Sequence, residues 1–269
     1  MKSRSWLLWV IAVLITLVSA VYQRMTGPTY PLRGQVVVGS ETIQFKLLRS
    51  SENPGDAEVA VTAPDTGMSG SYEFRRHPSG DPWTLMPLER KGDLLVARIP
   101  SQPAAGKVIY HIFIGKPGIG PVPLTDEPVT MRFKDYVPRI PILYPHILFM
   151  FAGMLCSTRA GLEALARKSE IFKIVLCTVI FLFIGGIVLG PIVQKYAFGA
   201  YWTGWPVGKD LTDNKTAVAM VFWVIALWRL RKNQGARGWI ILAAVITLVV
   251  FAIPHSLLGS EFDYTQTAK

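Results

Sequence analysis

The chain of 269 residues has few cysteines and lacks the short motifs that mark several large enzyme classes. Its two cysteines, Cys156 and Cys177, fall in apolar stretches, where a cysteine is most simply a small buried hydrophobe. Residues 24–137 contain none, so disulfides do not hold that region together. The sequence contains no Walker-type phosphate loop and no CxxC, CxxCH, GxSxG or HExxH motif. These absences argue against an ATPase, a c-type cytochrome, a serine hydrolase and a zincin.

The basic residues exceed the acidic ones, and the excess lies next to apolar stretches. The formal charge is +10, yet residues 24–137 hold 13 Lys/Arg against 12 Asp/Glu. Much of the excess comes from a set opposed only by Glu163 and Glu170: Lys2, Arg4, Arg159, Arg167, Lys168, Lys173, Arg229, Arg231, Lys232 and Arg237. Basic residues in short loops beside membrane spans remain in the cytoplasm. We therefore expect a lipid bilayer, and no nucleic acid, as a partner.

Five apolar stretches predict a membrane protein that combines an all-α bundle with an all-β domain. The stretches lie near residues 6–22, 140–157, 171–193, 216–230 and 239–254. Spanning the hydrocarbon of a bilayer takes about 20 helical residues. The predicted domains are an uncleaved, signal-like anchor (1–23), an external β domain (24–137) and a four-helix transmembrane bundle (138–269). We expect a bacterial inner-membrane protein with a cytoplasmic N-terminus and a periplasmic β domain and C-terminus.

Residues 31–135 show the alternation typical of β-strands. Seven strands are predicted, at 35–38, 42–47, 58–61, 71–75, 94–99, 107–114 and 129–133. Clusters of Pro, Gly, Asn and Asp separate them. In this pattern the stretch resembles an immunoglobulin or fibronectin-III domain, although the Cys…Trp…Cys core of true immunoglobulins is missing. The resemblance implies a β-sandwich and identifies no partner.

Two histidines fall inside predicted spans. His146 follows Pro145 near the outer end of the second span, and His255 follows Pro254 near the outer end of the fifth. Ionisable residues within spans are costly and often functional, and a neutral imidazole pair would hold a haem b or a divalent transition metal. The alternative is structural: each ring would satisfy a carbonyl freed by a proline kink, a headgroup or a water.

All four carboxylate side chains after Glu170 are expected on the outer side. They are Asp210, Asp213, Glu261 and Asp263. Together with the two histidines they would form a zinc, manganese or iron site. The competing interpretation is that Asp213 caps the fourth span and Asp210 pairs with Lys209 or Lys215.

The predicted external loop 194–213 is rich in aromatic residues. They include Tyr196, Tyr201, Trp202 and Trp205. Aromatic side chains favour the headgroup level of a bilayer, so the loop is expected to lie in the interface as a cap. In a functional interpretation, it would border a pocket for a quinone or a lipid.

Two functions remain open from the sequence. The first is a non-catalytic subunit or scaffold of an inner-membrane complex, which docks an extracytoplasmic partner through the β domain and is not an enzyme on its own. The second is a redox or metal-binding membrane protein, with a haem or metal held by His146 and His255, that exchanges electrons with a quinone or a periplasmic partner. A small transporter is disfavoured, because the spans carry few polar residues at mid-depth.

Overall fold

The structure is a computed structural model that describes residues 5–166, 171–208, 210–232, 235–255, 257, 259 and 261–265. The chain forms two compact units. The helical unit comprises Met1–Pro28 and Val137–Ser260, and the β-rich unit comprises Thr29–Tyr136 and Glu261–Lys269. The sequence grouped the last residues with the bundle, whereas their contacts are with the β-rich unit.

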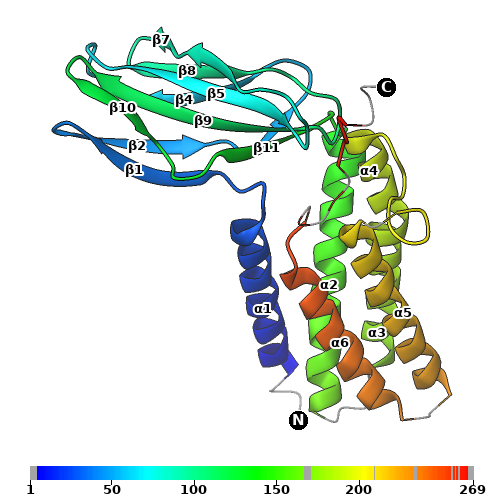
Figure 1. The fold of residues 1–269 in the computed structure, drawn as a ribbon. Coiled ribbons are helices and arrows are strands. Elements are labelled where there is room, and N and C mark those ends of the chain that lie inside the picture. The colour runs from blue at the N-terminus through cyan, green and yellow to red at the C-terminus, as the bar shows by residue number, and fades with distance from the viewer. Residues whose placement is uncertain are drawn as a thin grey trace. The chain divides into compact units, whose positions relative to one another are not determined.

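The helical unit contains the following elements (Figure 1): α1 (Ser5–Thr26), η2 (Arg139–Leu143), α2 (Tyr144–Leu165), α3 (Phe172–Leu182), η3 (Phe183–Leu189), α4 (Gly190–Phe198), α5 (Leu211–Arg231) and α6 (Ala236–Ala252). The η elements are π-helical and continue directly into the neighbouring α-helices. In the described part of the chain, three helical stretches are long and apolar enough to cross a membrane: Ser5–Thr26, Arg139–Leu165 and Phe172–Phe198. Three of the five expected spans meet this criterion of length and composition, and Ala236–Ala252 is a shorter apolar helix.

Local sequence explains where the helices begin and end. Pro145 lies in the first turn of α2, where its missing N–H costs nothing. Gly199 adopts a left-handed conformation after the last residue of α4, as glycine does at a helix C-terminus. α6 ends at Ala252, because Ile253 precedes Pro254 and takes an extended conformation.

Small residues bring the helices close together. A Cβ at Gly161 of α2 would lie 2.7 Å from Cβ of Ala244 on α6, so these two backbones approach as near as they can. Trp223 of α5 is fully buried, and its Nε1 donates a hydrogen bond of 2.8 Å to Thr247 Oγ1 on α6. Cys177 is exposed on α3, contrary to the expectation of a buried side chain.

The β-rich unit has three sheets. Its strands are β1 (Leu32–Val38), β2 (Glu41–Leu47), β3 (Ser50–Glu52), β4 (Ala57–Thr62), β5 (Ser69–His77), β6 (Thr84–Pro87), β7 (Glu89–Lys91), β8 (Leu94–Ile99), β9 (Lys107–Lys116), β10 (Ile119–Pro123) and β11 (Val129–Lys134). β1 and β2 form a two-stranded sheet, and β4, β8 and β7 a three-stranded one. The six-stranded sheet has the order β3-β11-β9-β5-β6, with β10 paired to β9. All seven predicted strands are present.

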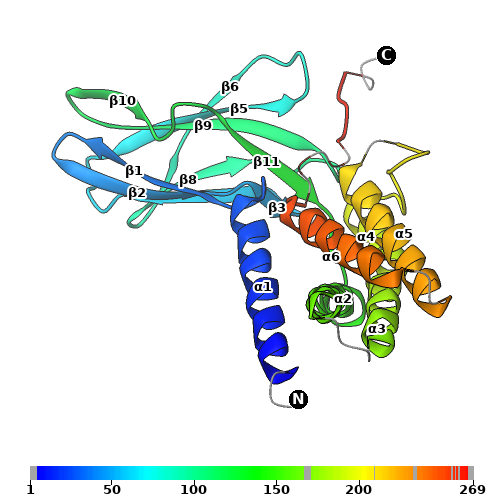
Figure 2. The ribbon, with the colours of Figure 1, turned by 90° about the horizontal axis from the view of Figure 1, so that it is seen from below.

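All three sheets share one hydrophobic core. It includes Phe45 from the first sheet, Val59 from the second and Tyr110 and Phe133 from the third. The segment Thr84–Lys91 joins two of the sheets, because β6 pairs with β5 while β7 pairs with β8. Figure 2 shows β6 at the margin of the unit beside β5. This crossing leaves one edge of the six-stranded sheet accessible.

Candidate functional site at the ends of α4, α5 and α6

The first turn of α5 holds the aromatic loop that precedes it. Asp213 Oδ2 accepts hydrogen bonds from the backbone N–H groups of Thr203, at 2.7 Å, and Gly204, at 3.0 Å. Asn214 Oδ1 accepts one from the Trp205 N–H at 2.7 Å. A Cβ on Gly204 would lie 2.7 Å from Cβ of Asp213, so only glycine allows this close approach. The loop therefore has a fixed backbone at this point.

Asp210 caps α5, which corrects the expectation that Asp213 would do so. Its Oδ1 accepts a hydrogen bond from the Thr212 N–H at 2.8 Å, and the helix begins at Leu211. Its Oδ2 accepts one from Thr203 Oγ1 at 3.2 Å. Lys209, one expected partner of Asp210, lies outside the described residues, and Lys215 lies within electrostatic range of Asp210.

Two side chains from other helices satisfy the carbonyl groups at the end of α6. Lys215 Nζ donates to the Ile253 oxygen at 2.6 Å, and Gln23 Nε2 of α1 donates to the Phe251 oxygen at 2.6 Å. The last carbonyls of a helix have no partner within it, and a cation there also interacts favourably with the helix dipole. Lys215 is buried in this role. The ends of α1, α5 and α6 are thereby connected.

His146 binds a carbonyl in the π-helical segment of the neighbouring helix. Its Nδ1 donates to the Gly185 oxygen at 2.9 Å, and the same oxygen accepts the Gly190 N–H. The sequence offered a structural alternative in which the ring satisfies a carbonyl freed by a proline kink. The ring does bind a carbonyl, but this carbonyl belongs to another helix and not to a kink at Pro145. With Nδ1 used in this way, Nε2 is the nitrogen that would bind a metal or haem.

His255 follows the end of α6 and is exposed. Its ring lies within electrostatic range of Lys215, His146 and Asp210. The two histidines and the carboxylates Asp210 and Asp213 are thus found at one end of the helical unit. The assignment of this group to a haem or a metal stays a prediction.

The other two carboxylates of the predicted metal site belong to the β-rich unit. Glu261 forms an ion pair with Lys107. Asp263 Oδ1 accepts hydrogen bonds from Thr265, from its N–H at 2.9 Å and from its Oγ1 at 2.6 Å. Among the described residues, no group of three or more His, Cys, Asp or Glu side chains is arranged to hold a metal ion.

Three of the four aromatic side chains named for the loop are exposed. Tyr196, Tyr201 and Trp205 are exposed, and Trp205 is 77% exposed. Trp202 is partly buried, and its Nε1 donates to the Trp205 carbonyl at 3.1 Å. Lys195 Nζ lies 5.6 Å from the centre of the Tyr201 ring. These rings are free to contact lipid or another protein.

A buried ion pair lies in the second half of α2. Arg159 is 1% exposed, and its Nη2 lies 2.5 Å from Glu163 Oε1. The same Nη2 donates to Ser5 Oγ at 3.0 Å, and the guanidinium lies 5.1 Å from the centre of the Trp9 ring. The sequence placed Arg159 in an internal loop, but α2 continues to Leu165. The pair fixes the start of α1 against α2.

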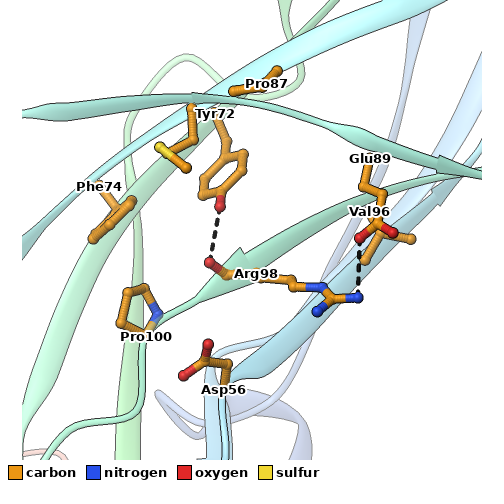
Figure 3. Close-up of a pocket in the computed structure, with 9 residues that line it drawn as sticks. Asp56, Tyr72, Phe74, Pro87, Glu89, Val96, Arg98 and Pro100 are labelled. Atoms are coloured by element: carbon orange, nitrogen blue, oxygen red, sulfur yellow. Dashed lines mark hydrogen bonds and ion pairs between the residues drawn. The ribbon is translucent and has the colours of Figure 1, made fainter.

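The β-rich unit has an open cleft that the sequence did not reveal. It has a volume of about 370 Å³ and lies where the segment Thr84–Lys91 passes between two sheets (Figure 3). Its lining residues are Asp56, Tyr72, Phe74, Met86, Pro87, Glu89, Val96, Arg98 and Pro100. Figure 3 shows the Tyr72 hydroxyl donating to the Arg98 carbonyl, at 2.9 Å, and Arg98 paired with Glu89, at 3.0 Å. The lining of the cleft thus combines exposed apolar atoms with the ion pair of Arg98 and Glu89.

Comparison with known proteins adds no assignment. No model of a known protein family matches the sequence, and no curated protein sequence matches it.

Replacing Asp213 with alanine should loosen the aromatic loop. The substitution removes the acceptor of two backbone N–H groups, and each buried donor left without a partner costs about 1–3 kcal/mol. We expect Asp213→Ala to lower the thermal stability of the purified protein and to open residues 199–208 to limited proteolysis. Asp213→Asn keeps one acceptor oxygen and should lie between wild type and Asp213→Ala. Equal protease resistance in all three proteins would contradict the role given to Asp213.

Proposed function

We propose that the protein is a non-catalytic, membrane-anchored subunit or scaffold of a bacterial inner-membrane complex, and that its β-rich unit docks an extracytoplasmic partner. The single observation that carries the proposal is the open cleft beside β6. All four residues of β6 are exposed, and Leu85 is 66% exposed. An exposed apolar edge strand is a surface that proteins normally cover. In the proposal, the partner covers it.

Five membrane crossings fit this proposal. Besides the three long apolar stretches, α5 and α6 pack against each other, and α6 also packs along α2. α6 has 17 residues and a length of about 26 Å, close to the ~30 Å of hydrocarbon. Arg231, Lys232 and Arg237 lie at the connection of α5 and α6, which supports a cytoplasmic position for that connection.

The C-terminal residues require an even number of crossings after the β-rich unit, a condition that five crossings in total satisfy, as do three. Residues 261–265 pack on the β-rich unit, so both are on one side of the bilayer. The chain between them must cross an even number of times. Crossings by α2, the stretch Phe172–Phe198, α5 and α6 satisfy this condition. The immunoglobulin-like β-sandwich remains part of the proposal, supported by the shared core of the three sheets.

A photo-crosslinking amino acid in place of Met86 tests the docking surface. Met86 lines the cleft and is 44% exposed. In native membranes we expect one discrete adduct of higher mass at this position, because a seated partner lies within bond-forming range. The same amino acid at Val37, on β1, is the control. Val37 is more exposed, at 62%, so random collisions label it at least as well. No adduct at Met86, or equal labelling of both positions, contradicts the proposal.

One observation favours a redox protein as the second candidate. His146 donates its Nδ1 hydrogen to a backbone carbonyl, which is how proteins commonly orient a histidine that binds a metal or haem through Nε2. His255 would supply the second nitrogen, and the exposed rings of Tyr196 and Trp205 would border a quinone. Against it, Asp210 and Asp213 are engaged with backbone groups.

An absorption spectrum with and without dithionite separates the two candidates. The scaffold proposal predicts no Soret or α band that sharpens on reduction, and no bound transition metal by elemental analysis. A reducible b-type spectrum that is lost in His146→Ala and kept in His77→Ala favours the redox candidate. His77 is exposed in the β-rich unit, so its replacement controls for loss of a histidine alone.

A further inference from the structure

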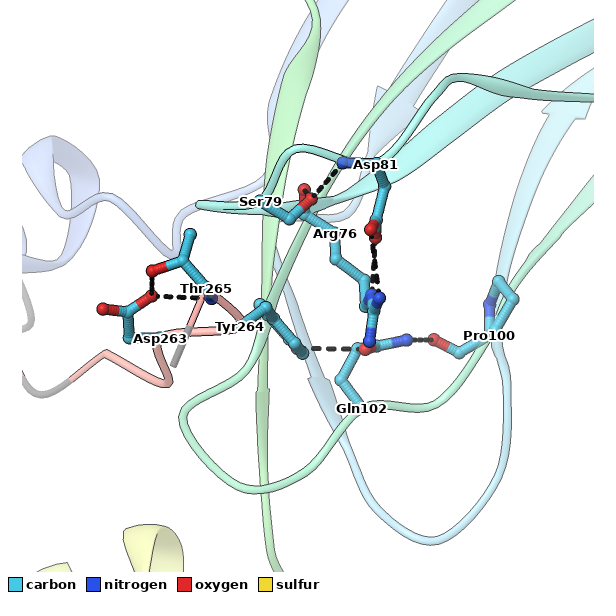
Figure 4. A network of polar contacts seen from close by, with 8 residues as sticks. All are labelled: Arg76, Ser79, Asp81, Pro100, Gln102, Asp263, Tyr264 and Thr265. Carbon is cyan, nitrogen blue, oxygen red and sulfur yellow. Dashed lines mark hydrogen bonds and ion pairs between the residues drawn. The ribbon is translucent and has the colours of Figure 1, made fainter. Parts of the chain in front are cut away.

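The C-terminal tail buries a tyrosine in the β-rich unit. Tyr264 follows α6 by a short connection, yet it is only 5% exposed. Figure 4 shows its hydroxyl donating to Gln102 Oε1, at 2.9 Å. The Arg76 guanidinium lies 5.0 Å from the centre of the Tyr264 ring, and the centres of the Phe262 and Tyr264 rings are 5.0 Å apart. Chain termini are usually poorly ordered unless specific contacts hold them.

Charge and backbone contacts hold the tail at its other end. Glu261 forms an ion pair with Lys107, and the Phe262 N–H donates to the Ala105 oxygen at 3.3 Å. A Cβ on Gly106 would clash with the Tyr264 hydroxyl. The β-rich unit therefore contacts the tail through two side chains: a carboxylate, and a tyrosine three residues later.

The residues that receive the tail are held in place by other contacts. Arg76 is paired with Asp81, with N–O distances of 2.5 and 3.0 Å. Gln102 Nε2 donates to the backbone oxygen of Pro100 at 3.0 Å, and the backbone oxygen of Gln102 accepts from Asn53 Nδ2 at 2.9 Å. A site whose groups are positioned before the ligand arrives binds with less loss of conformational entropy.

We propose that Arg76, Gln102, Gly106 and Lys107 form a peptide-binding socket on the β-rich unit, and that residues 261–265 of the same chain are its resident ligand. The chemistry that the socket recognises is a carboxylate followed, three residues later, by a tyrosine. Because the tail belongs to the same chain as the socket, a modest intrinsic affinity suffices to fill the socket in cis. This inference does not depend on the proposed function.

The proposal is tested with the chain truncated after Ser260, purified in detergent, and a fluorescein-labelled peptide of residues 259–269. Fluorescence anisotropy should detect saturable binding to the truncated protein and little binding to the full chain, whose socket is filled. A peptide with Tyr264→Ala should bind at least about tenfold more weakly, as expected when a central aromatic anchor is removed. Failure of the wild-type peptide to bind a truncated protein that still melts cooperatively overturns the proposal, as does equal binding to the full chain.

A second variant guards against misfolding of the truncated protein. Full-length Tyr264→Ala keeps every residue of the socket and should bind the wild-type peptide. If it melts like the wild type and does not bind the peptide, the proposal is also overturned. A dimer of the full chain that exchanges tails would fill the socket in trans, and size-exclusion chromatography detects this as a loss of monomer in favour of dimer, which contradicts docking in cis.

Charge reversal tests whether the contact is specific. Lys107→Glu in the truncated protein should lower the affinity for the wild-type peptide by about tenfold, because the attraction between two partly exposed charges becomes a repulsion. A peptide with Glu261→Lys should bind the Lys107→Glu protein with most of the lost affinity restored. A purely structural effect of Lys107→Glu would not be reversed by a change in the peptide, and absence of recovery contradicts the pairing of Lys107 with Glu261.

The pH dependence supplies an independent readout. Burial raises the pKa of the Tyr264 hydroxyl, so it remains protonated and donates to Gln102 at neutral pH. Because the docked pKa exceeds that of the free peptide, docking favours the neutral form. The affinity should therefore be constant below pH about 10 and fall above it. A Tyr264→Phe peptide should lack the part of this fall that comes from the tyrosine, and an identical profile for both peptides argues against a docked hydroxyl.

Discussion

Polar groups at helix ends must find partners within the protein wherever apolar surroundings supply none. The end of the helical unit near the aromatic loop obeys this constraint closely. Asp213 accepts the loop amides, Lys215 and Gln23 donate to the last carbonyls of α6, and His146 donates to a carbonyl of the π-helical segment. These contacts connect α5 and α1 with the end of α6, and α2 with η3. They involve Asp213 and His146, two of the residues that the sequence predicted as metal ligands.

The β-rich unit depends on other contacts: a segment shared between two sheets, and a tail that returns to the unit. The segment Thr84–Lys91 pairs first with β5 of one sheet, through β6, and then with β8 of another, through β7. The cleft lies beside β6. The tail then returns from α6 and places Tyr264 in its socket. The chain thus connects the two units after α1, before α2 and again after α6. In the proposed function, the β-rich unit presents this cleft to a partner.

The sequence predicted the longer strands and missed the short or exposed ones. β9 alternates between buried and half-buried positions, whereas β6 is exposed at all four positions and β3 and β7 have only three residues each. The apolar helices were found, but their ends depended on single contacts: the cap by Asp210 and the break at Pro254. The socket of Tyr264 joins residues far apart in sequence, so no local pattern signals it. The carbonyl bound by His146 likewise depends on packing between two helices.

The most direct measurement is the accessibility of single cysteines, introduced after replacement of Cys156 and Cys177, to a membrane-impermeant maleimide. The positions are Thr84→Cys on β6, Val207→Cys in the aromatic loop and Gly235→Cys before α6, all exposed. The account predicts labelling of the first two positions in cells with a permeabilised outer membrane, and of the third only after the inner membrane is opened. Labelling of position 235 from outside would contradict the crossing by α5 and, with it, the orientation on which the docking proposal depends.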